Sequence, residues 1–121
     1  MSKRILVVED EEDNRRIMRD LLTSVGYEII EAVTGPEGVT AAETQLPDLI
    51  LMDIQLPGLD GYEATRRIKS NPVLRHIPII VVTSYALSGD DVKAFEAGCN
   101  AYISKPFSPR ALLAKVREYL P

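Results

Sequence analysis

Three runs of four consecutive apolar residues constrain the fold of this chain more than any other feature of its sequence. They are residues 5–8, 49–52 and 79–82. Short unbroken apolar runs with polar or turn-forming residues at both ends are typical of strands that are buried on both faces of a parallel sheet. The three runs therefore predict the centre of such a sheet.

Two further short candidate strands and five candidate helices alternate with these runs. Residues 28–32 and 100–104 are the other predicted strands, and the first of them is less apolar, which favours a place near an edge of the sheet. Gly, Pro and Asn residues mark the ends of the segments between the strands. The helices are expected over residues 13–25, 34–46, 62–70, 88–98 and 108–120.

The first helix has a predicted inner face and a predicted outer face. The inner face is predicted from apolar residues at helical spacing, which are Ile17, Leu21, Leu22 and Val25. The outer face is predicted from charged residues, which are Arg15, Arg16, Arg19 and Asp20.

Strict alternation of strand and helix predicts an α/β fold with one parallel sheet, helices on both of its faces and right-handed crossovers. We expect the flavodoxin-like doubly wound architecture, a five-stranded sheet in the order 2-1-3-4-5 with five helices. A chain of 121 residues has the length of one ordinary domain. Residues 1–121 are therefore expected to form a single domain.

Polar residues follow the strands at the points where they end. In the order 2-1-3-4-5 the first and third strands are neighbours, so Glu9, Asp10 and Asp53 are expected to converge at one crevice at the carboxyl edge of the sheet. Thr83 and Lys105 follow the fourth and fifth strands at the same edge. Taken by itself, Asp53 is equally well interpreted as a turn residue before the Leu-Pro-Gly segment, and the other strand ends favour a site.

Three carboxylates in one crevice repel one another, and a divalent cation that prefers hard oxygen ligands relieves this repulsion. The pattern predicts Mg²⁺ and phosphoryl transfer, with Asp53 as the nucleophile that forms an aspartyl-phosphate. Lys105 would neutralise the phosphate and the Thr83 hydroxyl would hydrogen-bond it. The alternative, a structural ion pair between Lys105 and Asp53, leaves the other polar strand ends unexplained.

Composition excludes several other classes of function. A net charge of −4 and a pI near 5.0 argue against a nucleic-acid-binding domain. No apolar run approaches the roughly 20 residues that cross a bilayer, and no signal peptide is present, so a cytoplasmic protein without membrane contact is expected. The one cysteine, Cys99, is expected to be packed rather than reactive, and one cysteine with one histidine makes zinc improbable.

These residues together resemble the receiver domain of two-component response regulators, and the resemblance covers the whole chain. It rests on the acidic pair, the acceptor, the hydroxyl and the Lys-Pro pair at the strand ends, which are Glu9, Asp10, Asp53, Thr83, Lys105 and Pro106. Successive separations of 43, 30 and 22 residues from Asp10 to Asp53, Thr83 and Lys105 are also typical of the family. Any one of these features would be weak alone, and together they are specific.

The resemblance implies a site and a phosphoryl donor. Mg²⁺ would be bound directly by Asp10, Asp53 and the backbone carbonyl of Gln55, with Glu9 acting mostly through water. A phosphohistidine on a histidine kinase or a histidine phosphotransfer protein would donate the phosphoryl group to Asp53. The peptide bond before Pro106 is expected to be cis.

The resemblance also implies a route by which the signal leaves the site. Thr83 and Tyr102 are the candidate switch pair, although an aromatic residue on a last strand is also consistent with simple core packing. The downstream protein target is expected on the face formed by the fourth helix, the fifth strand and the fifth helix. Gln55 and Tyr85 occupy the positions that tune phosphate lifetime in this family.

The expected function is that of a stand-alone response regulator in a phosphorelay, which signals through phosphorylation-dependent protein binding. It would not be an enzyme with a separate substrate, but it would catalyse its own Mg²⁺-dependent phosphotransfer and autodephosphorylation. Two alternatives stay open, a pseudo-receiver that is never phosphorylated and a receiver module excised from a hybrid histidine kinase. A haloacid-dehalogenase-like phosphatase is disfavoured because position 55 is Gln rather than Asp.

Overall fold

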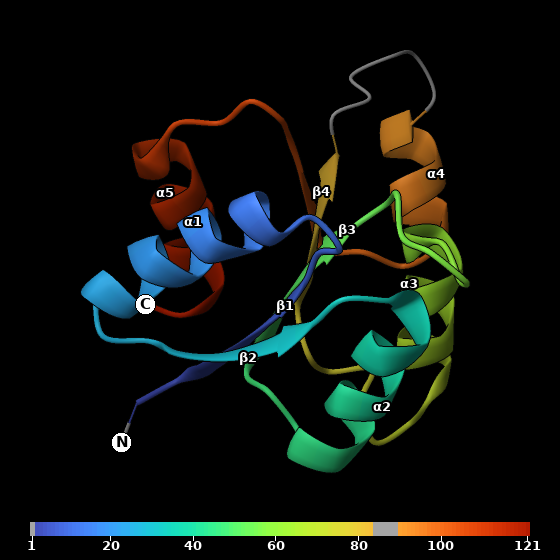
Figure 1. Cartoon of the computed structure of the whole chain (residues 1–121). Helices are drawn as coiled ribbons and strands as arrows, with labels where there is room; N and C mark the ends of the chain where they lie inside the picture. The colour runs from blue at the N-terminus through green and yellow to red at the C-terminus, as the bar shows by residue number, and fades with distance from the viewer. Residues whose placement is uncertain (1, 84–89) are drawn as a thin grey trace.

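The structure is a computed structural model that describes residues 2–83 and 90–121 (Figure 1). Its strands are β1 (Arg4–Val8), β2 (Glu28–Ala32), β3 (Leu49–Asp53), β4 (Ile79–Thr83) and β5 (Ala101–Ser104). They form one sheet in the order β2-β1-β3-β4-β5, and every neighbouring pair is parallel. The predicted fold class and strand order are therefore confirmed.

Helices cover both faces of the sheet. They are α1 (Glu12–Ser24), α2 (Gly35–Gln45), α3 (Gly61–Ser70), α4 (Asp90–Glu96) and α5 (Pro109–Tyr119). Figure 1 shows α1 and α5 on one side of the sheet, with α2, α3 and α4 on the other. Within the described ranges, no helix combines the length and the apolar character needed to cross a bilayer.

The central strands supply side chains to two cores, because successive residues of a strand point to opposite faces. On one face, Ile5, Val7, Leu49 and Leu51 pack with buried residues of α1 and α5. On the other face, Leu6, Val8, Ile50 and Met52 pack with buried residues of α2, α3 and α4. Burial on both faces explains why the central strands are continuous apolar runs rather than alternating ones.

Helices α2, α3 and α5 each begin with an N-cap residue, a short polar side chain that hydrogen-bonds to the first turn. Thr34, Asp60 and Ser108 each accept a hydrogen bond from the backbone N–H three residues later, at 3.1, 2.9 and 3.0 Å. Glycines in the left-handed region follow α1 and α4, with φ of +100° at Gly26 and +105° at Gly98. The predicted start of the fourth helix at residues 88 and 89 lies outside the described residues.

The predicted inner face of α1 is wrong at two positions. Ile17 and Val25 are 55% and 39% exposed, whereas Met18 and Leu22 are 3% and 0% exposed. The helix is rotated so that Arg15, which was predicted to point outward, lies on the same stripe as these two buried residues and retains 16% of its side-chain exposure. Its guanidinium group hydrogen-bonds to Glu9 and Glu31 at the edge of the sheet. A charged residue therefore occupies a position on the inward-facing stripe where an apolar residue is usual.

Substitution of Met18 and Ile17 tests this orientation of α1. Met18→Ala is expected to lower the free energy of unfolding by about 2–4 kcal/mol, because it leaves a cavity in the core. Ile17→Ala, the matched control one residue away, is expected to change it by less than about 1 kcal/mol. Chemical denaturation measures both values, and a larger loss for Ile17→Ala would contradict the orientation.

Candidate functional site

The predicted polar residues do meet at the carboxyl edge of the sheet. Asp53 and Thr83 are the last residues of β3 and β4, and Lys105 directly follows β5. Glu9 follows β1 and extends its pairing with β2, since its backbone N–H donates to the Ala32 carbonyl at 3.0 Å. The parallel register places these strand ends side by side.

Three carboxyl groups form the centre of this cluster. One carboxylate oxygen each from Glu9, Asp10 and Asp53 lies within 4.8 Å of the others. Glu9 and Asp53 are 1% and 6% exposed, whereas Asp10 faces solvent. The cluster therefore consists of two buried carboxyl groups, those of Glu9 and Asp53, and one solvent-exposed carboxyl group, that of Asp10.

Lys105 is the cation beside this cluster. Its Nζ lies 2.7 Å from Oε1 of Glu9 and 3.7 Å from Oδ1 of Asp53. The second oxygen of the Glu9 carboxylate accepts the backbone N–H of Glu11 at 3.2 Å. The nearer partner of Lys105 is thus Glu9, so a simple ion pair between Lys105 and Asp53 does not describe the site.

Burial and mutual repulsion separate the proton affinities of the two buried carboxyl groups. Burial, reinforced by the negative charge of Glu9, raises the pKa of Asp53 to about 7. Burial also raises the pKa of Glu9, but hydrogen bonds from Lys105 and Asp53 outweigh it, and the net pKa of Glu9 is lowered. Near neutral pH, Glu9 therefore carries a negative charge readily, whereas ionisation of Asp53 beside it is energetically unfavourable.

This donor set fits a divalent cation of the Mg²⁺ type. The available ligands are hard carboxylate oxygens, which such cations prefer. Lys105 pairs with Glu9 and Asp53, yet burial and the negative charge of Glu9 still raise the pKa of Asp53. Another positive charge next to Asp53 would stabilise its ionised form.

The remaining predicted site residues lie as follows. Thr83 is fully buried, and its carbonyl accepts the backbone N–H of Lys105 at 2.6 Å. Tyr102 is half-buried and packs against the core under α4, while Gln55 is exposed in the segment after β3. The peptide bond between Lys105 and Pro106 is cis, as the resemblance implied. Tyr85 lies outside the described residues.

Gly61 supports the site and was not predicted to do so. Its N–H donates to the Ile54 carbonyl at 2.9 Å, and the Ile54 N–H donates to Oδ1 of Asp53 at 2.9 Å. A Cβ at position 61 would lie 2.0 Å from the backbone oxygen of Asp53. Only glycine lets the start of α3 approach the acidic strand end this closely, and a glycine at the start of a helix was the available signal in the sequence.

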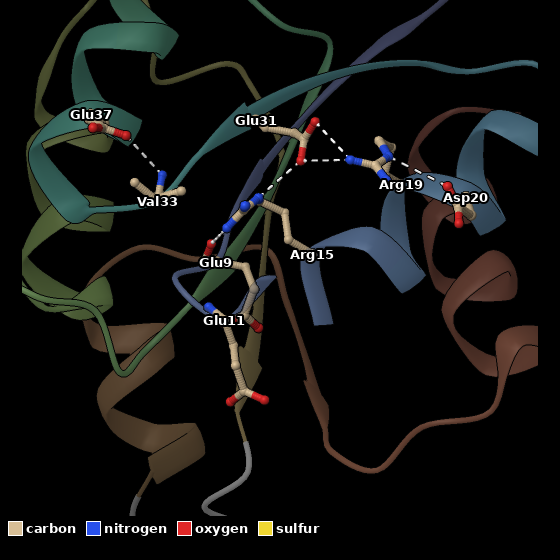
Figure 2. Close-up of polar contacts among 8 residues, drawn as sticks. All are labelled: Glu9, Glu11, Arg15, Arg19, Asp20, Glu31, Val33 and Glu37. Carbon is tan, nitrogen blue, oxygen red and sulfur yellow. Dashed lines mark hydrogen bonds and ion pairs between the residues drawn. The ribbon is translucent and has the colours of Figure 1, made fainter. Parts of the chain in front are cut away.

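Arg15 is the second residue that the sequence did not reveal. Its Nη1 donates to the backbone carbonyl of Glu9 at 3.0 Å, and its Nε donates to Oε1 of Glu31 at 2.9 Å. Figure 2 shows the guanidinium group between these two acceptors. Periodicity gave no signal for this role, because an arginine on an amphipathic helix is usually solvated.

Comparison with known families matches residues 5–117 to the model of the response regulator receiver domain. The chain belongs to this family. It is 45% identical over 120 residues to the polar-differentiation response regulator DivK of Brucella ovis, a match that covers 99% of this chain and 98% of that protein. Receiver domains act in two-component signalling, so this chain is a response-regulator signalling protein.

Solved structures of other receivers have the same fold. The receiver domain of a sensor histidine kinase from Pseudomonas aeruginosa PAO1, which has a magnesium ion coordinated in its active-site cleft, is 39% identical with a TM-score of 0.93, covering 99% of this chain and 98% of that one. A CheY-like response regulator receiver domain protein from Methanospirillum hungatei JF-1 is 36% identical with a TM-score of 0.92, covering 99% and 94%.

The raised pKa of Asp53 predicts a pH-dependent effect of Asp53→Asn on stability without metal. Between its ordinary value of 3.8 and about 7, the folded state binds more protons at Asp53 than the unfolded state does, so stability falls as pH rises through this window. Asn carries no such penalty. Asp53→Asn is therefore expected to be more stable than the wild type at pH 8, by about 1–3 kcal/mol, and the gain is expected to shrink toward pH 5.

Urea denaturation in the presence of EDTA measures this effect. Asp13→Asn, at a carboxyl group that is 75% exposed, is the matched control and should show little change between the two pH values. A gain for Asp53→Asn that is the same at both pH values would contradict the assigned proton affinity.

Proposed function

We propose that Asp53 accepts a phosphoryl group from a phosphohistidine on a histidine kinase or histidine phosphotransfer protein, and that the phosphorylated form signals by binding another protein. The observation that carries this proposal is the arrangement of Asp53. Its carboxyl group is 6% exposed, lies within 4.8 Å of carboxylate oxygens of Glu9 and Asp10, and has the Lys105 ammonium group at 3.7 Å.

In the proposed transfer, a carboxylate oxygen of ionised Asp53 attacks the phosphorus atom of the phosphohistidine. An oxygen–phosphorus bond forms, the phosphorus–nitrogen bond breaks, and its electron pair returns to the imidazole of the donor, which takes up a proton. Lys105 exchanges Glu9 for an oxygen of the incoming phosphoryl group. The Thr83 hydroxyl, at the end of the adjacent strand, hydrogen-bonds another of these oxygens.

Mg²⁺ is the cation proposed for this site. Asp10, Asp53 and the backbone carbonyl of Gln55 would bind it directly, with Glu9 acting mostly through water. When bound, it supplies positive charge that offsets the negative charges of the carboxylates and the phosphoryl group. Hydrolysis of the aspartyl-phosphate by water at the same site would be autodephosphorylation, which ends the signal. Gln55 and Tyr85 are proposed to set its rate.

A groove beside Lys105 supports docking of the donor protein. It measures about 530 Å³ and is lined by Asn14, Ile17, Met18, Lys105, Pro106 and Phe107. Ile17 is 55% exposed at this groove, so a large apolar side chain is accessible there to a partner. We infer that the donor contacts this apolar surface while its phosphohistidine reaches Asp53.

The output face is proposed on α4, β5 and α5. Val92 and Phe95 lie one turn apart on α4 and are 54% and 52% exposed, so this helix presents apolar surface to a partner. Tyr102 on β5 packs against the core beneath α4. Thr83 and Tyr102 are proposed to move together on phosphorylation and to change the shape of this face.

We infer that residues 1–121 act as a single, stand-alone domain in the cytoplasm. The match to 98% of the length of DivK supports this arrangement, and a role in the cell cycle or polar differentiation is proposed from the same relative. The Pseudomonas relative is a receiver domain of a sensor histidine kinase, which supports the alternative that the chain is a module of such a protein.

Intact mass spectrometry tests the acceptor. Incubation with acetyl phosphate and Mg²⁺ is expected to add one phosphoryl group to the wild type and none to Asp53→Asn, which lacks the nucleophilic oxygen. EDTA is expected to abolish the addition. An unchanged wild-type mass in a folded, Mg²⁺-binding sample would instead favour the pseudo-receiver.

Lys105→Ala tests the link between phosphorylation and switching. The variant is expected to fold and to accept the phosphoryl group, because Asp53 remains, but to lose the conformational response of Tyr102 and the output face. Amide chemical shifts of β5 and α5, recorded before and after phosphorylation, measure this response. A wild-type pattern of shift changes in phosphorylated Lys105→Ala would contradict the role given to Lys105.

A further inference from the structure

We propose that Arg15 is a positioning residue that fixes the peptide unit between Glu9 and Asp10 and thereby holds the acidic pair in the arrangement that a divalent cation needs. The inference rests on the proposed function, since it concerns the same cation site. It assigns to α1 and to the edge strand β2 a part in building that site.

The contacts of Arg15 join three elements. The residue lies one turn into α1, donates Nη1–H to the Glu9 carbonyl at 3.0 Å and donates Nε–H to Oε1 of Glu31, on β2, at 2.9 Å (Figure 2). Its side chain is 16% exposed, whereas the side chain of Glu31 is 33% exposed, so the buried part of the pair is the arginine. Both bonds have a charged donor, which makes them stronger than bonds between neutral groups.

The bond to the Glu9 carbonyl acts on both acidic residues. The carbonyl of Glu9 and the amide nitrogen of Asp10 belong to one rigid planar unit, so an anchored oxygen restricts the backbone torsions on either side of it. The N–H of Glu9 is already held by the Ala32 carbonyl at 3.0 Å. Because the N–H and the carbonyl of Glu9 are both hydrogen-bonded, the backbone orientation of Glu9 is fixed. The plane of the peptide unit that leads into Asp10 is fixed as well.

Glu31 orients the guanidinium group for this task. Its carboxylate accepts Arg15 at 2.9 Å and also receives Nη1 of Arg19 at 3.4 Å. Arg19 lies one turn further along the same helix and shares Glu31. Among the described residues, its side chain donates to Glu31 and Asp20 and not to Glu9. Arg15 and Arg19 therefore form a matched pair of residues that differ in contact with the acidic strand end.

A purely electrostatic role and a positioning role of Arg15 predict opposite changes in Mg²⁺ affinity when Arg15 is removed. Loss of a positive charge near a cation site strengthens cation binding, because the repulsion between them disappears. Loss of an anchor for the ligand residues weakens binding, because the ligands must be ordered when the cation binds. The direction of the change in Mg²⁺ affinity therefore distinguishes the two.

Isothermal titration with MgCl₂ of the unphosphorylated protein tests the proposal. Arg15→Met is expected to raise the Kd about tenfold, which is the usual scale for loss of a group that orients a metal ligand. Arg15→Lys, which keeps the charge but loses the paired donors, is expected to fall between this variant and the wild type. Arg19→Met, the matched control, is expected to stay within about twofold, since the ligand residues keep their anchor.

A second measurement reports the contact without metal. The backbone ¹⁵N resonance of Asp10 in EDTA is expected to shift in Arg15→Met and to stay near its wild-type position in Arg19→Met, because the Glu9 carbonyl accepts a hydrogen bond from Arg15 and Arg19 bonds to Glu31 and Asp20 instead. If Arg15→Met does not fold, Arg15→Lys carries both measurements.

An unchanged or lower Kd for Arg15→Met or Arg15→Lys would overturn the proposal, and so would equal weakening by Arg19→Met. These outcomes leave the proposed function intact as long as the wild type binds Mg²⁺ and Asp10→Asn does not. Failure of the wild type to bind Mg²⁺ would overturn the proposed cation site together with the role of Arg15.

Discussion

Glu9 and Asp53 place two buried carboxyl groups against one ammonium group, that of Lys105, at 2.7 and 3.7 Å. The strand order makes this unavoidable, because β1 and β3 are neighbours, Glu9 directly follows β1 and Asp53 ends β3. The sheet cannot relieve the repulsion by moving a strand, since its central strands are buried on both faces by two close-packed cores. The site therefore depends on protonation of Asp53 or on an added cation.

The contacts around this cluster extend across the sheet. Lys105 connects the end of β5 to Glu9 at the end of β1, and Arg15 connects Glu9 to Glu31 on β2. A phosphoryl group on Asp53 would compete with Glu9 for Lys105, so one event at β3 would alter contacts on both sides of it. This explains how a small chemical change at a buried residue can reach the β5 side, where Tyr102 lies beneath α4.

The fold and the carboxylate cluster were predictable because both follow from patterns that are local in the sequence. Apolar runs fix the strands, and the strand order then brings their polar end residues together. The face of α1 was not predictable from periodicity, since Ile17 and Met18 are both apolar and the choice between them depends on where Arg15 finds its partners. The role of Gly61 depends on a close approach to the backbone of Asp53, which spacing in a sequence does not encode.

Titration of the Asp53 side-chain carboxyl carbon by NMR, with and without Mg²⁺, tests this account most directly. Without metal, we expect a pKa of about 7 for Asp53, caused by burial and by the charge of Glu9. With saturating Mg²⁺ we expect Asp53 to stay ionised well below that pH, because the cation stabilises the carboxylate. A metal-free pKa near the ordinary value of 3.8, unchanged by Mg²⁺, would contradict the account.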